Sequence, residues 1–144
     1  MVARGVIECD GKFLLVRNLA SPTFWCLPGG KIEDGEDVVT AMERELVEET
    51  GIHPEIGNLL YVHQIQNDNG YGMPEFFFFV KNGQDYLRVD IEKTSHGTLE
   101  LAELGFKDVA TVKLLPKFLK TELPKLATSS FDIPTRFRLS LLPS

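Results

Sequence analysis

The sequence predicts a single α+β domain, built from separate stretches of strand and helix. Its 144 residues are enough for one domain with a buried core, and we expect residues 1–144 to form it. Short apolar runs bounded by turn residues occur near the N-terminus and between residues 59 and 81, as is typical of strands. In residues 36–50, apolar positions recur at intervals of three and four, as is typical of a helix.

The first expected elements are a hairpin over residues 3–17 and a loop over residues 18–35. Asp10-Gly11 separates two apolar segments and favours a tight hairpin turn. Several Pro and Gly residues then interrupt regular structure, although residues 25–27 should form a short extended piece. This loop leads into the helix.

A helix is expected over residues 36–50 because this stretch contains neither Gly nor Pro. Gly51 follows directly and is a typical C-terminal cap. One side of the helix carries a stripe that should face the core, formed by Val39, Met42, Leu46 and Thr50.

Three carboxylates, Glu45, Glu48 and Glu49, lie beside that stripe at roughly 100° per residue, so we place them at the edge of the core, facing a cleft. Carboxylates at this spacing repel one another. A divalent cation would relieve the repulsion, and Mg²⁺ often bridges protein carboxylates to substrate phosphates. The segment therefore suggests metal-assisted phosphate chemistry. The alternative is a solvated acidic helix face.

Strands are expected next at residues 59–65 and 76–81. The polar segment between them, residues 66–74, is a loop of a length that often carries function. Residues 85–92 are a weaker strand candidate, whereas residues 98–109 fit either a strand or a helix.

A second helix is expected from Pro116 to Leu123, because Pro is favoured in the first turn and apolar residues follow at helical spacing. After Pro124 the chain is expected to be irregular. The tail, residues 127–144, could form an extra strand, pack on the domain or join a dimer contact.

The composition excludes some classes of partner. A formal net charge of -6 argues against broad attachment to nucleic acid or anionic membranes, because surfaces that bind them are normally basic. Cys9 and Cys26 match neither a disulfide framework nor a paired metal motif, so we expect reduced thiols. The N-terminus lacks the features of a secretory signal, and the aromatic run at residues 76–80 is too short to span a bilayer. We expect a soluble cytoplasmic protein.

Residues 30–52 fit the pattern G-x(5)-E-x(7)-R-E-U-x-E-E-x-G-U, in which U is an apolar residue. The defined positions are filled by Gly30, Glu36, Arg44, Glu45, Leu46, Glu48, Glu49, Gly51 and Ile52. A DGKFLLV hairpin and the motif W-x-LPGG precede this segment, and a LLPKFL helix follows later. The chain thus resembles the Nudix hydrolase family over residues 3–123, which leaves residues 124–144 as a C-terminal tail.

The resemblance implies an α/β/α sandwich around a mixed central sheet. It also implies Mg²⁺- or Mn²⁺-dependent hydrolysis of the diphosphate linkage in a nucleoside diphosphate derivative such as a nucleoside triphosphate, ADP-ribose or a nucleotide sugar. A bound metal ion would neutralise phosphoryl charge and activate a water molecule. The implied metal ligands are the carboxylates of Glu45, Glu48 and Glu49 and the main-chain carbonyl of Gly30. Glu36 and Arg44 resemble the structural ion pair of the family.

The general base is expected to be one of the three carboxylates or an acid from a later loop. For the later loop, the resemblance makes Glu100 the first candidate and Glu103 the second. Phe24, Trp25 and Tyr71 could stack on a nucleobase, although lone aromatic residues more often pack in a core or cleft. The three histidines, His53, His63 and His96, lack metal-ligand spacing and are expected to be surface or core residues.

The substrate is not determined by these motifs. Asn67 and Asp68 occupy the positions at which two Nudix subfamilies carry a proline or a tyrosine, so neither subfamily is indicated. The alternative to an enzyme is a non-catalytic Nudix-fold module that binds or senses a nucleotide. An RNA-processing enzyme fits poorly because the chain lacks a basic stripe. By resemblance, a homodimer is a possible assembly.

Overall fold

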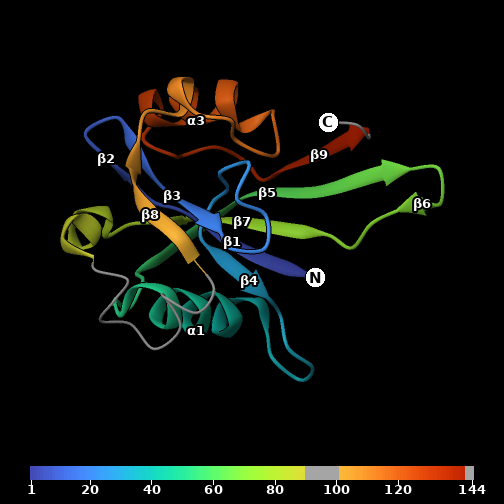
Figure 1. Cartoon of the computed structure of the whole chain (residues 1–144), viewed down its shortest axis with the longest axis horizontal. Coiled ribbons are helices and arrows are strands. Elements are labelled where there is room, and N and C mark those ends of the chain that lie inside the picture. Colours follow the sequence, from blue (N-terminus) through green and yellow to red (C-terminus); the bar gives the residue numbers. More distant parts are fainter. Residues whose placement is uncertain (90–100, 142–144) are drawn as a thin grey trace.

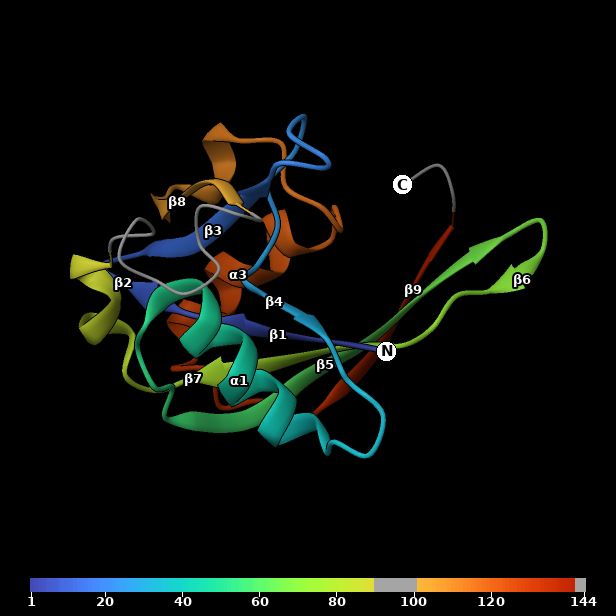
Figure 2. The same cartoon turned by 60° about the horizontal axis from the view of Figure 1, so that its bottom comes forward.

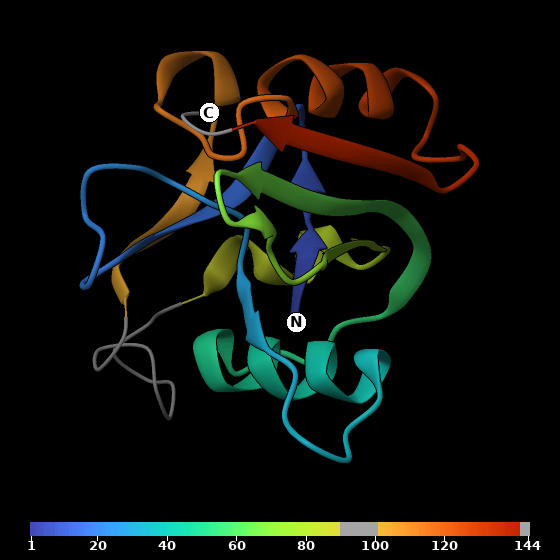
Figure 3. The same cartoon turned by 90° about the vertical axis from the view of Figure 1, so that its right-hand side faces the viewer.

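A computed structural model of the chain describes residues 1–89 and 101–141, and in it two β-sheets lie between two helices (Figure 1). Helix α1 (Val38–Thr50) covers one side of the sheets and α3 (Leu119–Thr128) covers the other, as Figure 3 also shows. This arrangement confirms the predicted α+β sandwich. No helix in the described ranges is both long and apolar enough to cross a membrane.

The larger sheet is mixed and has the strand order β4-β1-β7-β5-β6, with β9 also paired to β5. Its strands are β1 (Val2–Val6), β4 (Gly29–Lys31), β5 (Ile56–Asn67), β6 (Gly70–Tyr71), β7 (Glu75–Val80) and β9 (Arg136–Leu141). β1 runs parallel to β7, and β9 runs parallel to β5, whereas the other pairs are antiparallel. Of the alternatives for the tail, residues 136–141 therefore form the extra strand.

The smaller sheet is antiparallel and consists of β2 (Glu8–Cys9), β3 (Lys12–Asn18) and β8 (Leu101–Lys107). Asp10 and Gly11, with φ values of 52° and 79°, make the predicted turn between β2 and β3. The predicted hairpin was too long, because residues 2–6 leave it and pair in the larger sheet. Val6 and Ile7 are both fully buried and belong to two different core clusters, because successive side chains of the extended chain point to opposite sides.

Two other strand predictions are resolved by the structure. The prediction of a weak strand at residues 85–92 is wrong for residues 85–88, because Gly83–Arg88 form a 3-10 helix, η1. Tyr86 in η1 is buried and donates to the Ile52 carbonyl at 3.2 Å, which holds the turn against the end of α1. The ambiguous segment 98–109 contains β8 and leads into a second 3-10 helix, η3 (Val109–Thr111).

The helices differ from prediction at their ends. α1 begins at Val38 because the Asp37 carboxylate caps it, accepting from the Thr40 N–H at 2.9 Å, and it ends at Gly51 with φ 75°. Val39 is 40 % exposed and does not belong to the buried stripe. α3 continues through Pro124 to Thr128, so the expected irregular chain after Pro124 was wrong. Leu126 is buried beyond that proline and stabilises the extra turn.

The core has two main layers. One lies between the sheets and α3 and contains Leu15, Leu60, Phe77, Leu119 and Leu123. The other lies against α1 and contains Ala3, Met42, Leu46, Phe78 and Tyr86. β1 runs between these layers and carries β4 on its edge, which brings the loop before α1 onto the helix itself.

Candidate functional site

The candidate site begins where β4 lies against α1. Glu49 on α1 is 2 % exposed, and its Oε1 accepts a hydrogen bond from the Gly29 N–H at 3.1 Å. The next residue, Gly30, is so close to the helix that a Cβ atom there would lie 2.5 Å from the carboxylate of Glu45. Glycine allows this approach without moving Glu45, and it places the Gly30 main chain beside a carboxylate.

Arg44 connects the carboxylates of this segment. Its Nε and Nη2 bind both oxygens of Glu36, at 2.8 and 3.0 Å. Its Nη1 lies between two further carboxylates, 3.0 Å from Glu45 and 3.3 Å from Glu48. The second Nη2 hydrogen bond goes to the Lys31 carbonyl at 2.9 Å. The ion pair implied for Glu36 and Arg44 is thus present as a two-point contact that fixes the loop to the helix.

These contacts change the titration of both partners. Hydrogen bonds from Arg44, and then from the Glu33 N–H, hold the pKa of Glu36 below its ordinary value. The hydrogen bonds to Glu36 in turn raise the pKa of Arg44. The guanidinium therefore stays charged and the Glu36 carboxylate stays ionised at neutral pH.

The donor set fits a hard divalent cation. Glu45 and Glu48 both direct a carboxylate oxygen at one cationic atom, Arg44 Nη1, and the Gly30 main chain adjoins Glu45. Carboxylate and carbonyl oxygens are the ligands that Mg²⁺ and Mn²⁺ prefer. In the described ranges, no three His, Cys, Asp or Glu side chains form a ready-made metal-binding group. Glu45 and Glu48 are instead gathered around the Arg44 guanidinium.

A pocket of about 390 Å³ opens on the other side of β1 and is lined by Arg4, Asn18, Phe24, His63, Glu75 and Pro116, among others. It adjoins the carboxylate cluster through a short piece of chain. Arg4 Nη1 donates to the Leu27 carbonyl at 2.9 Å, and Arg4 pairs in register with Gly29, whose N–H binds Glu49. The pocket is thus connected to the candidate metal ligands through Arg4 and its contacts with residues 27 and 29.

Charged and polar side chains form a network in the floor of this pocket. Arg4 Nε donates to Glu75 Oε2 at 2.6 Å, and Glu75 Oε1 lies 3.1 Å from His63 Nδ1. Burial alone would raise the pKa of Glu75, but the hydrogen bond from His63 and the charge of Arg4 outweigh it and lower the pKa. Glu75 is therefore an anion held inside the protein by two donors.

The three aromatic candidates are separated in the structure. Phe24 lines the pocket, so it is the one placed to stack on a ligand. Trp25 packs on the core. The Arg17 guanidinium and the Lys107 ammonium lie over its ring, 5.8 and 5.1 Å from the centroid, where a stacked base would otherwise lie. Tyr71 lies on β6 and is 62 % exposed.

Of the two acids expected from the later loop, the structure describes Glu103. Glu100 falls outside the described residues. Glu103 lies on β8 and pairs with Arg17 at 3.3 Å and with Lys107 at 3.4 Å. Of the histidines, His96 also falls outside the described residues, whereas His63 is a pocket residue that sequence reasoning left without a role. The sequence did contain a sign of this position, because His63 lies two residues from both Tyr61 and Ile65 and therefore shares their face of the strand.

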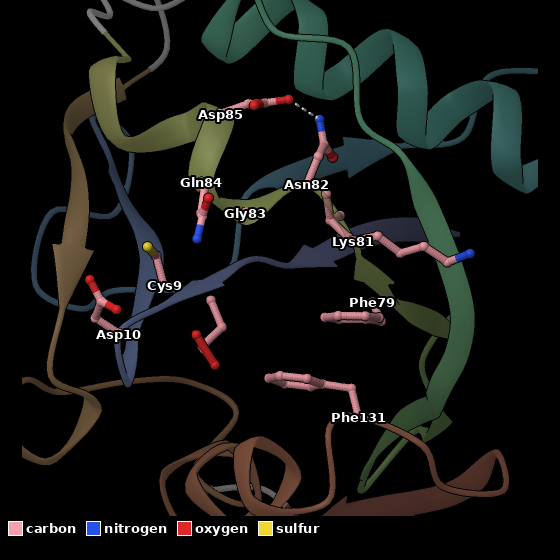
Figure 4. Close-up of a pocket in the computed structure, with 11 residues that line it drawn as sticks. Cys9, Asp10, Phe79, Lys81, Asn82, Gly83, Gln84, Asp85 and Phe131 are labelled. Carbon is pink, nitrogen blue, oxygen red and sulfur yellow. Dashed lines mark hydrogen bonds between the residues drawn. The ribbon is translucent and has the colours of Figure 1, made fainter.

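A second cavity of about 390 Å³ is shown in Figure 4. It lies between the β2–β3 turn and η1, and the stacked rings of Phe79 and Phe131 form one wall, with centroids 4.4 Å apart. Asn82 and Asp85 on its rim bind each other at 3.0 Å. The pocket beside Arg4 is the better candidate for the functional site, because Arg4 pairs in register with Gly29, whose N–H binds Glu49.

Comparison with known proteins identifies the family. The family model described as the NUDIX domain matches residues 1–122. An ADP-ribose pyrophosphatase of Methanocaldococcus jannaschii is 46 % identical over 61 residues, covering 41 % of this chain and 36 % of that protein. A MutT-like protein of Streptomyces ambofaciens is 41 % identical over 116 residues, covering 79 % of this chain and 73 % of its own length.

The alignments differ in how much of each relative they include. The chain spans 36 % of the archaeal protein and 38 % of a nucleoside diphosphate-linked moiety X motif 6 protein of Xenopus laevis. Among solved structures, a UDP-X diphosphatase superposes with a TM-score of 0.71 at 24 % identity, over 94 % of this chain and 66 % of that one. At this identity the superposition supports the fold.

Proposed function

The chain belongs to the Nudix hydrolase family, and from this premise we propose that it hydrolyses the diphosphate linkage of a nucleoside diphosphate derivative with Mg²⁺ or Mn²⁺. The observation that carries the proposal is the close contact of residues 29–30 with α1, next to a pocket of nucleobase size. Anhydride cleavage needs a cation at the phosphates and a binding site for the rest of the substrate, and these features would supply both.

In this proposal the carboxylates of Glu45, Glu48 and Glu49 and the carbonyl of Gly30 would hold the metal. When bound, the metal would neutralise charge on the phosphoryl oxygens and lower the pKa of a water molecule. Arg44 and Glu36 would keep the loop and helix in register. A carboxylate of the cluster would take the proton of the attacking water, and Glu100 remains a further candidate for that role.

The substrate would place its base or sugar in the pocket and its phosphates over residues 29–30. Phe24 would stack on the ring, while Arg4 and Asn18 would offer hydrogen bonds. Nucleoside triphosphates, ADP-ribose and nucleotide sugars remain the proposed substrates. Relatives described as a CTP pyrophosphohydrolase of Escherichia coli and as an ADP-ribose pyrophosphatase support this range.

A substrate screen tests the proposal. Folded protein should release a nucleoside monophosphate from at least one member of a panel of nucleoside triphosphates, ADP-ribose and nucleotide sugars, with Mg²⁺ or Mn²⁺ present. Glu49→Gln should lower kcat by about a hundredfold or more. Glu43→Gln is the matched control, because Glu43 lies on the exposed side of the same helix. No turnover over the whole panel would refute the enzymatic function.

A nucleotide-sensing module is the second candidate. It is favoured by the pocket beside Arg4, whose lining would bind a base or sugar independently of the carboxylate cluster. Calorimetry would show binding of ADP-ribose or a nucleotide sugar, and prolonged incubation with metal would leave the ligand intact.

A homodimer is the proposed assembly. Strands β5 and β9 extend away from the helices together with the β6 turn (Figure 2), and Phe137, Leu139 and Leu141 are 43–63 % exposed there. These three alternate residues pair in register with Val62, Gln64 and Gln66 and therefore share one face of the sheet. Leu139→Glu should shift a dimer to monomer in sedimentation experiments, whereas Leu87→Glu on η1 should not. The free, buried thiols Cys9 and Cys26 suit a reducing compartment, and we propose the cytoplasm.

A further inference from the structure

A chain of hydrogen bonds crosses four neighbouring strands and ends in the pocket. It begins on β9, where the Ser140 hydroxyl lies 2.8 Å from Nε2 of His63 on β5. It continues from His63 Nδ1 to Glu75 on β7 at 3.1 Å, and from Glu75 to Arg4 on β1 at 2.6 Å. Arg4 then binds the Leu27 carbonyl just before Gly29. Ser140 lies beyond residue 122, where the family match ends.

The ionised carboxylate of Glu75 determines the direction of its bond with His63. Glu75 is ionised and can only accept, so His63 Nδ1 must carry the proton that it donates. In the neutral imidazole, Nε2 is then an acceptor, and the Ser140 hydroxyl is its donor. His63 is 1 % exposed, and its ring packs on Phe118 and Phe77 at centroid distances of 5.2 and 6.2 Å, which prevents it from turning away.

Arg4 has donors to spare at the pocket. A guanidinium carries five N–H groups, and the described contacts of Arg4 use one to Glu75 and one to Leu27. Because Glu75 balances its charge at 2.6 Å, the site would not attract a phosphate strongly. A neutral ring that presents carbonyl or ring-nitrogen acceptors would suit it better, with Phe24 as the stacking surface.

We propose that Arg4 recognises the acceptor edge of the substrate's base, and that Ser140, His63 and Glu75 are positioning residues that hold Arg4 in place. Strand β9 thus contributes to base selectivity although it lies outside the conserved domain match. The inference rests on the proposed nucleotide substrate and specifies which part of that substrate the pocket reads. Ser140 acts through His63 and does not itself touch the substrate.

The test compares the four common ribonucleoside triphosphates, which share one triphosphate and differ only in the base. Arg4→Lys keeps the charge beside Glu75 but removes the planar set of donors, so the ratio of kcat/KM between the best and worst base should fall about tenfold or more. Ser140→Ala should reduce the same ratio about threefold to tenfold through KM, with kcat changed less than about twofold. Ser129→Ala is the matched control, since its hydroxyl also makes a hydrogen bond, to the Leu126 carbonyl.

Two substitutions at His63 separate positioning from packing. Asn places an amide near the position of Nδ1 and can still donate to Glu75, whereas Gln reaches the position of Nε2 and cannot do so as well. His63→Asn should therefore retain base selectivity within about threefold, and His63→Gln should lose it. Thermal melting of every variant identifies any that unfold, because a folding defect lowers activity on all four triphosphates in the same proportion.

Binding of the four nucleoside monophosphates in EDTA tests the inference without any bond cleavage. Selective binding that Arg4→Lys abolishes would support it even if the wild-type protein hydrolysed nothing, in which case only the proposed function would fail. Equal affinity of the wild-type protein for all four bases would overturn it, as would variants that weaken all four equally. Covalent labelling of Ser140 by a fluorophosphonate would also overturn it, by making that serine a nucleophile.

Discussion

Replacing Arg44 by Gln should destabilise the protein by about 3 kcal/mol. Arg44 uses all five of its N–H groups, four on carboxylates and one on the Lys31 carbonyl, and its side chain is only 23 % exposed. Its loss would leave Glu36, Glu45 and Glu48 facing one another without a cation. Breaking a largely buried ion pair costs about 3–5 kcal/mol, and the partial exposure of Arg44 favours the lower value, about 3 kcal/mol.

Urea unfolding in EDTA measures this change directly, and the melting temperature should fall by about 6–12 °C. Arg17→Gln is the matched control, because Arg17 meets Glu103 at 3.3 Å with 33 % of its side chain exposed, and such pairs contribute about 0–1 kcal/mol. If Glu45, Glu48 and Glu49 are metal ligands, Mg²⁺ should stabilise the Arg44→Gln protein more than the wild type. A loss no larger than that of the control would refute the central position given to Arg44.

Three other perturbations test separate parts of the structure. Gly30→Ala should displace the Glu45 carboxylate and remove most of the activity, but it should cost under about 1 kcal/mol because the end of a flexible side chain can move. Gly105→Ala in β8 has room and should keep both activity and stability, and an equal loss of activity would contradict the close approach. The pKa of Glu36 lies below its ordinary 4.5, so its contribution to stability is complete above pH 4.5 and is lost as the pH falls below it; urea midpoints should drop there in the wild type and drop less in Arg44→Gln. Met42→Ala should cost about 2–4 kcal/mol and Val39→Ala under about 0.5 kcal/mol in the same urea assay, and a comparable cost at Val39 would restore the predicted stripe.

Local signals in the sequence predicted the elements whose causes are local. The turn at Asp10-Gly11, the helix that Gly51 ends and the strands near residues 60 and 78 each depend on a few adjacent residues. The sequence-based predictions failed where contacts with residues distant in the sequence determine the local structure. Residues 2–6 join the larger sheet because β4 and β7 offer them edges, and η1 replaces a strand because Tyr86 is anchored on Ile52.

The carboxylate cluster was predictable for the same reason, since Arg44, Glu45, Glu48 and Glu49 share one helix and Glu36 lies close before it. The spacing of 3.6 residues per turn places them together whatever the rest of the chain does. The pocket was not predictable in this way. Its network is formed by residues of four different strands, Arg4, His63, Glu75 and Ser140, which lie up to 136 positions apart in the sequence. Only the strand order of the folded sheet brings them into contact.

This difference separates two properties of the site. The residues proposed to cleave the bond lie on one helix and its preceding loop, where the local spacing alone would bring them to the proposed cation. The residues proposed to choose the base depend on the register of β9, β5, β7 and β1, and a shift of one residue in β9 would turn Ser140 to the opposite face, away from His63. Selectivity in this chain should therefore be more sensitive than the chemical step to changes in the C-terminal strand.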